Sequence, residues 1–433
     1  MSNARHKILA GSALLASVAL VTACSTTDEG SSSDGTTELT ILWQSGDQNS
    51  LDAVIASFEE DYPDITITPT YVAPADMQQT MRTQFAAGTM TDLTWVWPGN
   101  GNVGAIDVIA PAGYLVDLSD EPWVEDLPDD VRDLSSVDGA TYAFMTQLTA
   151  WGALYNQDAM DAAGLEIPTT WSEVLQFCAD AKSLGLSAYA LGTATNYETQ
   201  NTPYSLYPEL VETGDADGLT ALADGEATFA DTAWKTVIEK TQEMAEAGCH
   251  NDGFQGTDVD TAHNLWAAGD SLAITSIGQY LSIPDATVTI APLPGTDDAS
   301  ASEVGLAPFG GLAINAASDK IDAAKVFVEY MATPEHDTQY VYAAGGGDGS
   351  TPAASGSIPV LQDEDNLPTD SVSLTLLQLQ SEGRTGTFPD QLWPNPEVQA
   401  NMYSGLQSLY SGDATVDDVL ASMQEAYDEG GVE

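Results

Sequence analysis

Hydrophobic and polar positions along the first hundred residues alternate between the strand period and the helix period. Apolar runs over 39–43, 65–68 and 93–97 predict three strands. Between them, apolar residues spaced three and four apart over 51–58 and 77–85 predict two amphipathic helices, the second stopping near Gly88. The resulting β-α-β-α-β order is typical of a doubly wound α/β lobe.

The same alternation continues through the rest of the chain. Thr170 and Glu173 predict a capping box for a helix that ends at Gly185. The spacing predicts further helices over 234–244, 321–331 and 416–427, with Gly248 and Pro334 closing the first two. Buried strands are expected over 271–277 and 311–315, and exposed loops or crossings over 296–302 and 345–357.

Composition and charge narrow the class of protein. The chain has 433 residues, and 43% of them are apolar, enough for two or three packed domains and too many for a disordered chain. Its 66 acidic and 10 basic residues give a formal net charge of −56 at pH 7. Such a charge repels phosphate backbones and anionic lipid headgroups, so we expect no nucleic-acid partner and no direct binding to membranes.

The N-terminus has the pattern of an export signal. Arg5 and Lys7 precede an uncharged stretch over 8–23, too short to span a membrane, and Val21-Thr22-Ala23-Cys24 resembles the bacterial lipobox. We therefore expect a signal peptide over 1–23, lipidation (palmitate) of Cys24 and a flexible tether over 24–37. This places the protein at the extracellular face of the cytoplasmic membrane, anchored only by lipid. The alternative is an ordinary signal peptide with an incidental cysteine.

The remaining cysteines are Cys178 and Cys249. In an exported chain, an even number of cysteines left after Cys24 favours a disulfide between them. The alternative is that both are half-buried thiols. The histidines lack the spacing of metal ligands, so neither a metal nor another cofactor is expected.

Motifs that usually indicate an enzyme are weak here. Residues 99–104 fit the dinucleotide-binding pattern G-x-G-x-x-G, but they follow the third predicted strand rather than the first. This position favours a conformationally permissive glycine-rich loop over a dinucleotide-binding site. The glycine-rich stretch 345–350 lacks the lysine of a phosphate-binding loop, and no G-x-S-x-G elbow is present. We expect no catalytic residues, and an extracellular glycosidase or esterase remains a minor alternative.

Tryptophans at the ends of predicted strands suggest a binding site. Trp43, Trp97 and Trp151 each fall at or just beyond a strand end, where open α/β sheets bind ligands. Aromatic faces stack on sugar rings, and Gln44, Asp47 and Gln48 could bind hydroxyls. The alternative is that these tryptophans fill the core.

Four stretches resemble the family 1 extracellular solute-binding proteins of carbohydrate ABC transporters, the relatives of maltose-binding protein. They are residues 150–158 with 163–171, 265–274, 292–295 with 310–315, and 414–420. The resemblance covers nearly all of residues 38–430. It implies a two-lobe, periplasmic-binding-protein-like α/β fold with hinge strands and a ligand cleft between the lobes. The lobes are expected at 38–149 plus 306–358 and at 150–305 plus 359–433.

The resemblance also implies a mechanism and a site. The cleft would close on a sugar or oligosaccharide by hinge motion, and the closed monomer would dock on the transmembrane subunits of the permease. The residues implied as ligand contacts are Trp43, Gln44, Asp47, Gln48, Trp97, Asn100, Gln147, Trp151, Tyr280, Gly310 and Trp393, with Asn196 and Tyr197 as weaker candidates. A polyamine or another cationic solute is the alternative ligand, because aromatic boxes with carboxylates bind cations.

Overall fold

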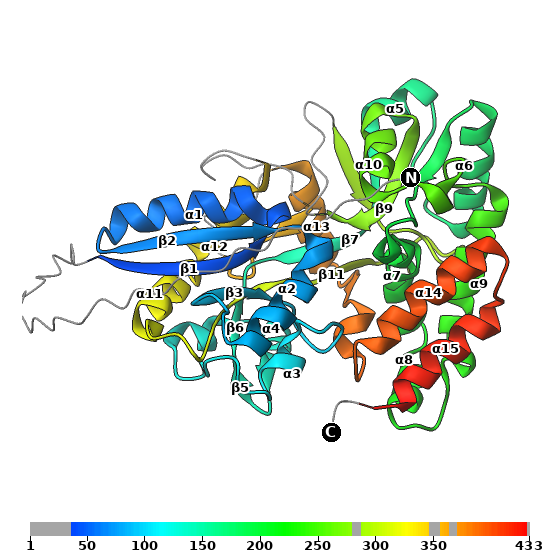
Figure 1. The fold of residues 1–433 in the computed structure, drawn as a ribbon. Coiled ribbons are helices and arrows are strands. Elements are labelled where there is room, and N and C mark those ends of the chain that lie inside the picture. The colour runs from blue at the N-terminus through cyan, green and yellow to red at the C-terminus, as the bar shows by residue number, and fades with distance from the viewer. Residues whose placement is uncertain (1–35, 279–286, 346–355, 363–369, 431–433) are drawn as a thin grey trace, which may run out of the picture. The chain divides into compact units, whose positions relative to one another are not determined.

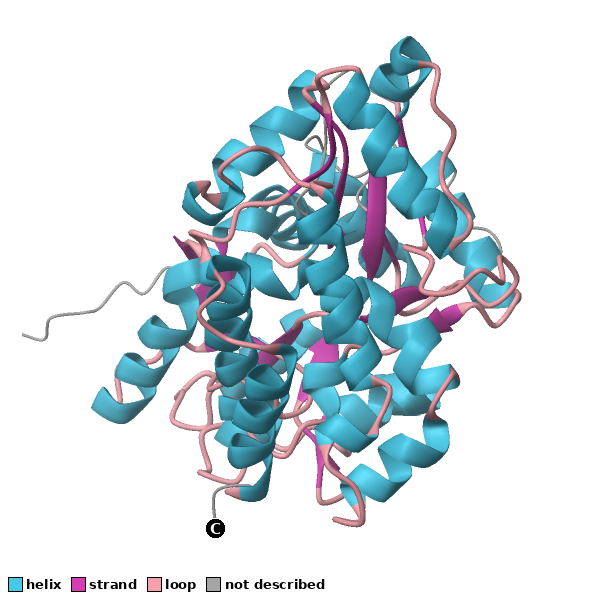
Figure 2. Ribbon diagram, turned by 90° about the vertical axis from the view of Figure 1, so that its right-hand side faces the viewer, coloured by secondary structure: helices cyan, strands magenta, loops and turns pink. Residues whose placement is uncertain are grey.

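The computed structural model describes residues 36–278, 287–345, 356–362 and 370–430. The predicted signal peptide, Cys24, most of the tether, Tyr280 and most of the 345–357 stretch lie outside these ranges. Within them the fold consists of two sheet-bearing lobes, with helices on both sides of the strands (Figures 1 and 2). The predicted two-lobe α/β class is confirmed.

The first lobe is built on a five-stranded sheet in the order β2-β1-β3-β12-β6. Strand β1 pairs in parallel with β2 and β3, and the late strand β12 returns antiparallel between β3 and β6. The strands are β1 (Thr37–Gln44), β2 (Ile65–Val72), β3 (Leu93–Val96), β6 (Ala143–Met145) and β12 (Gly311–Ile314). The helices of this part are α1 (Gln48–Asp61), α2 (Pro74–Ala87), α3 (Ile106–Ile109), α4 (Asp129–Leu134), α11 (Ile321–Met331) and α12 (Pro334–Tyr342), with a small hairpin of β4 (Ser136–Val137) and β5 (Ala140–Thr141).

The second lobe is built around the long buried strand β7 (Leu148–Asn156). Its sheet runs β14-β11-β7-β9-β8, and β10 and β13 also pair with β7. The other strands are β8 (Ser187–Ala190), β9 (Ser271–Ile277), β10 (Val288–Ala291), β11 (Val304–Pro308), β13 (Ser357–Ile358) and β14 (Thr385–Gly386). The helices are α5 (Gln157–Ala163), α6 (Trp171–Ser183), α7 (Asn201–Tyr207), α8 (Ala216–Ala223), α9 (Trp234–Ala247), α10 (Val259–Ala268), α13 (Ser371–Ser381), α14 (Glu397–Ser411) and α15 (Val416–Asp428).

Two short segments carry the chain between the sheets side by side. One joins β6 to β7 through Thr146 and Gln147, and the other joins β11 to β12 through Phe309 and Gly310. The backbone N–H of Thr146 donates to the carbonyl oxygen of Gly310 at 3.0 Å, so the antiparallel pairing of β7 with β11 continues into that of β6 with β12. A Cβ at Gly310 would overlap the indole ring of Trp95, which is why a glycine is needed there.

The helix boundaries follow the sequence signals, with one correction. Helices α2 and α9 end at Gly88 and Gly248, both in the left-handed conformation, as predicted. At α6, Thr170 accepts a hydrogen bond from the backbone N–H of Glu173, but the Glu173 carboxylate binds Thr169 rather than Thr170. The reciprocal half of the predicted capping box therefore lies one residue earlier in the chain.

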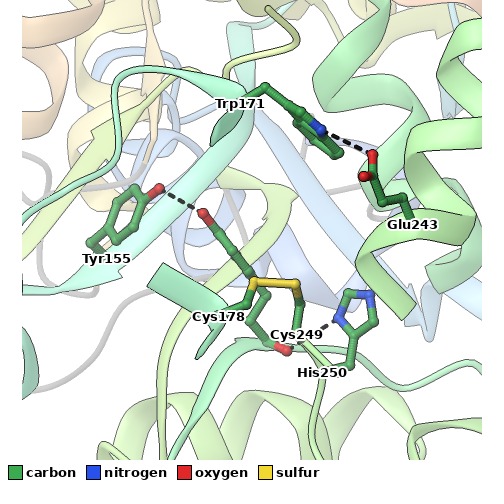
Figure 3. Close-up of a disulfide and its surroundings, with 7 residues drawn as sticks. Tyr155, Trp171, Cys178, Glu243, Cys249 and His250 are labelled. Atoms are coloured by element: carbon green, nitrogen blue, oxygen red, sulfur yellow. Dashed lines mark hydrogen bonds between the residues drawn. A yellow bond between two sulfur atoms is a disulfide. The ribbon is translucent and has the colours of Figure 1, made fainter. Parts of the chain in front are cut away.

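A disulfide joins Cys178 on α6 to Cys249 just after α9 (Figure 3). Both cysteines are buried in the core of the second lobe. Nearby, the indole N–H of Trp171 donates to Glu243 on α9 at 3.0 Å. The bridge and this hydrogen bond both link α6 to the α9 region, so two bonds besides apolar packing hold these elements together.

Candidate functional site

A cavity of about 860 Å³ lies between the two lobes. The first lobe contributes residues 44–46 after β1, Pro74 and Gln78 of α2, and the loop after β3. The second lobe contributes residues around 194–204, 259–263, 388–391 and 396–403, and the crossing adds Phe309. This is the cleft, and its size suits a ligand of several rings.

Aromatic side chains reach the cleft from both lobes. Trp97 lies one residue beyond the end of β3 and is only half buried. On the opposite side, Trp151 of β7 packs on Tyr204 of α7, with ring centroids 4.8 Å apart, and on Phe388, at 5.4 Å. The indole N–H of Trp151 is buried and has no hydrogen-bond partner among the described residues. These surfaces suit flat apolar faces such as those of sugar rings.

Polar groups interleave with the aromatic ones on the second lobe. The phenol of Tyr403 donates to Oε1 of Gln200 at 2.7 Å, and Nε2 of Gln399 donates to the Tyr204 hydroxyl at 3.0 Å. Gln399 and Tyr403 are four residues apart on α14, so both project from one face of that helix. The result is a pre-positioned set of amides and hydroxyls that can donate to and accept from ligand hydroxyls.

Two carboxyl groups on this wall have perturbed pKa values. Burial raises the pKa of Glu198 to about 8, only partly offset by a hydrogen bond from Asn201. Burial likewise raises the pKa of Asp390 to about 6, against the opposing effect of the Tyr204 hydroxyl. Among the described residues lining the cleft none is Lys or Arg, so no cation from the protein stabilises the ionised forms there.

Some predicted contact residues lie on the cleft and others do not. Gln44, Trp97 and Trp151 line it, as do the weaker candidates Asn196 and Tyr197. Trp43 is fully buried in the first lobe, where its indole N–H donates to the Tyr340 hydroxyl at 3.2 Å and its ring packs edge-on against Trp95. It is the penultimate residue of β1 rather than a residue beyond the strand, which puts it in the core.

The remaining predicted residues occupy other positions. Asp47 is buried next to residues 44–46, which line the cleft. Gln48 is the first residue of α1, and its side-chain amide donates a hydrogen bond to the Asp52 carboxylate. Gln147 and Gly310 are in the two crossing segments, whereas Trp393 is buried among Trp234, Tyr204 and Phe229. The Asn100 side-chain amide donates to the carbonyl oxygen of Pro394, across the lobes. Tyr280 lies outside the described residues.

Sequence reasoning missed much of the wall from the second lobe. Glu198 and Gln200 belong to a 3₁₀ helix, Asn196–Gln200, that leads into α7, and the stretch around 190–215 gives little periodic signal. Gln399 and Tyr403 could have been found, because they form an i, i+4 polar and aromatic pair on one face of α14.

Residues 43–338 match the family model of the bacterial extracellular solute-binding proteins. The chain belongs to this family. A search of curated proteins found no match. Among the described residues, no helix has both the length and the apolar character required to cross a membrane.

Solved structures share the fold. One, from work on xylan utilization by the thermophilic bacterium Caldanaerobius polysaccharolyticus, aligns with a TM-score of 0.75 at 17% identity, over 90% of this chain and 99% of that one. RafE in complex with raffinose aligns with a TM-score of 0.73 at 20% identity, over 90% of this chain and 100% of that one. A sugar transporter protein from Bacillus licheniformis in complex with stachyose aligns with a TM-score of 0.70 at 18% identity, over 91% of this chain and 100% of that one.

Proposed function

We propose that this solute-binding protein captures a neutral oligosaccharide in the cleft between its lobes and delivers it to an ABC permease. The observation that carries the proposal is the composition of the cleft walls. Trp97 from one lobe and the Trp151–Tyr204 pair from the other line the same cavity, together with amide and hydroxyl side chains. Sugars present apolar C–H faces and rims of hydroxyls, which this arrangement complements.

The crossing segments supply the motion that such capture needs. Within the part of the chain that the structure describes, short stretches around 146–147 and 309–310 pass from one sheet to the other. Rotation about these stretches would open the cleft without disturbing either sheet. A lipid on Cys24 would keep the protein near the permease.

The solved relatives support the choice of ligand class. Proteins of the same fold bind raffinose and stachyose, and another is described as a chitin oligosaccharide binding protein. A cavity of about 860 Å³ has room for a ligand of this size.

A cationic solute such as a polyamine is the second candidate, because Glu198, Asp260, Asp390 and Glu397 all line the cleft. The raised pKa of Glu198 favours the neutral ligand. A carboxyl group that is protonated near neutral pH can hydrogen-bond hydroxyls, whereas a cation has to ionise it first.

A thermal-shift screen separates the candidates. The mature protein would be heated with raffinose, stachyose, xylo-oligosaccharides, chito-oligosaccharides, spermidine and oligogalacturonate. A ligand at about 100 times its Kd adds roughly 2.7 kcal/mol to the free energy of unfolding, which raises Tm visibly. We expect a shift with at least one neutral saccharide, none with oligogalacturonate, and no sugar product after long incubation. A shift with spermidine alone would contradict the proposal.

A further inference from the structure

The glycine-rich loop that follows β3 reaches the opposite lobe. We call residues 98–102 the glycine loop and residues 389–394, which follow β14, the facing segment. The glycine loop extends from the first sheet and the facing segment from the second. The two nevertheless touch, because the Asn100 amide donates to the carbonyl oxygen of Pro394.

Gly99 and Gly101, the neighbours of Asn100 in the chain, make this close approach possible. A Cβ built on Gly101 would lie 2.7 Å from both the Cβ and the carbonyl oxygen of Asp390. A Cβ on Gly99 would lie 2.9 Å from the Cα of Gln391 and would overlap its carbonyl oxygen. Gly99 also has φ of 61°, which favours glycine independently. Both residues are therefore packed against the backbone of the other lobe and not only against flexible side chains.

Both partners are held in fixed shapes by their own hydrogen bonds. The side chain of Asn102 accepts from the Gly104 N–H at 2.9 Å, and the carbonyl oxygen of Gly99 accepts from the Asp107 N–H at 3.1 Å. In the facing segment, the Gln391 amide donates to the Pro308 carbonyl oxygen at 2.6 Å, which ties it to β11 beside the crossing. Neither surface has to be ordered when they meet, so the loss of conformational entropy on contact is small.

We infer that the glycine loop is an interlobe latch, in which Gly99 and Gly101 admit the facing segment and Asn100 binds it, so that the contact closes one end of the cleft. Gly101 and Asp390 both line the cavity, whereas Asn100 lies outside its lining. The G-x-G-x-x-G pattern therefore has a structural reason unrelated to phosphate binding. The contact depends only on the fold, but its effect on affinity rests on the proposed function.

Disulfide trapping tests the contact without any ligand. In the variant Gly101→Cys/Asp390→Cys the two Cβ atoms need to part by only about 1 Å to reach the spacing of a disulfide. Under oxidised glutathione we expect rapid loss of both new thiols. The matched control is Gly256→Cys/Asp390→Cys, because a Cβ at the exposed Gly256 would meet no atom of the described residues within 4 Å. Equal rates of thiol loss in the two variants would overturn the latch.

Binding measurements then test its role. We expect Gly101→Val to weaken saccharide binding by roughly tenfold or more, because the added methyl groups hold the lobes apart. Gly256→Val should bind as the wild type does, and circular dichroism should show both variants folded. Unchanged affinity in folded Gly101→Val would refute a role in closure. If the disulfide forms in the double-cysteine variant but the wild type binds no saccharide, the latch contact is supported and the proposed function is refuted.

Discussion

The carboxylate of Glu198 accepts a hydrogen bond from the side-chain amide of Asn201 at 2.8 Å, in the wall of the cleft. Among the described residues it is the one hydrogen bond that opposes the effect of burial on Glu198, whose pKa rises from 4.5 to about 8. Between these values the folded protein keeps a proton that the unfolded chain has lost. The free energy of unfolding therefore falls as the pH rises from about 4.5 to about 8.

Replacing this carboxyl group should remove its share of the pH dependence. Glu198→Gln keeps an acceptor for Asn201 but cannot ionise, so we expect it to match the wild type near pH 5 and to exceed it in stability above pH 8. The difference is bounded by about 1.4 kcal/mol for each unit of pKa shift. Urea unfolding from pH 5 to 9 measures it, with Glu226→Gln, at an exposed site, as the control. Parallel pH profiles for Glu198→Gln and the wild type would contradict the assignment.

The disulfide should stabilise the second lobe without contributing to binding. Cys178 and Cys249 are 71 residues apart in the chain, and neither lines the cleft. The double variant Cys178→Ala/Cys249→Ala should lose roughly 2–4 kcal/mol of unfolding free energy in urea. Its saccharide affinity, measured well below its Tm, should equal that of the wild type. Equal stability of the two proteins would show that the bridge does not constrain the chain.

The glycine in the crossing should be intolerant of any side chain. Gly310→Ala places a methyl group on the ring of Trp95, which is fully buried, and should cost about 1–3 kcal/mol of unfolding free energy. Trp95→Phe, which removes part of the ring, should be less harmful in the Gly310→Ala background than in the wild type. Gly256→Ala is the control without a steric neighbour. Additive effects of the two substitutions in urea unfolding would refute the steric explanation.

Regular elements could be predicted because their signals are local. Strand β9 begins and ends at the predicted residues Ser271 and Ile277, and α9 stops where Gly248 supplies a left-handed residue. Apolar periodicity and glycine caps depend on a few neighbouring residues, so a single sequence contains them. The order of these elements was sufficient to predict the α/β class.

The cleft depended on information that is not local. Trp43 and Trp97 both come near strand ends, yet β1 extends through Gln44 and buries Trp43, whereas β3 stops before Trp97. A shift of one or two residues in a strand end thus decides whether a tryptophan is core or cleft. The Tyr403 hydroxyl reaches Gln200 only because the 3₁₀ helix Asn196–Gln200 packs against α14, and no spacing in the sequence shows that.

Calorimetric titration of the wild type and of Trp97→Ala with the same neutral saccharide tests whether the aromatic wall of the cleft binds sugar. Trp97 is half buried, so its replacement should leave the fold intact, while the loss of one stacking wall should weaken binding by about 2 kcal/mol, roughly thirtyfold. Trp97→Phe, which keeps an aromatic face, should lose much less. We expect one saccharide to bind per chain of the wild type, with affinity falling from the wild type through Trp97→Phe to Trp97→Ala. Saccharide binding that is unchanged in Trp97→Ala would contradict it.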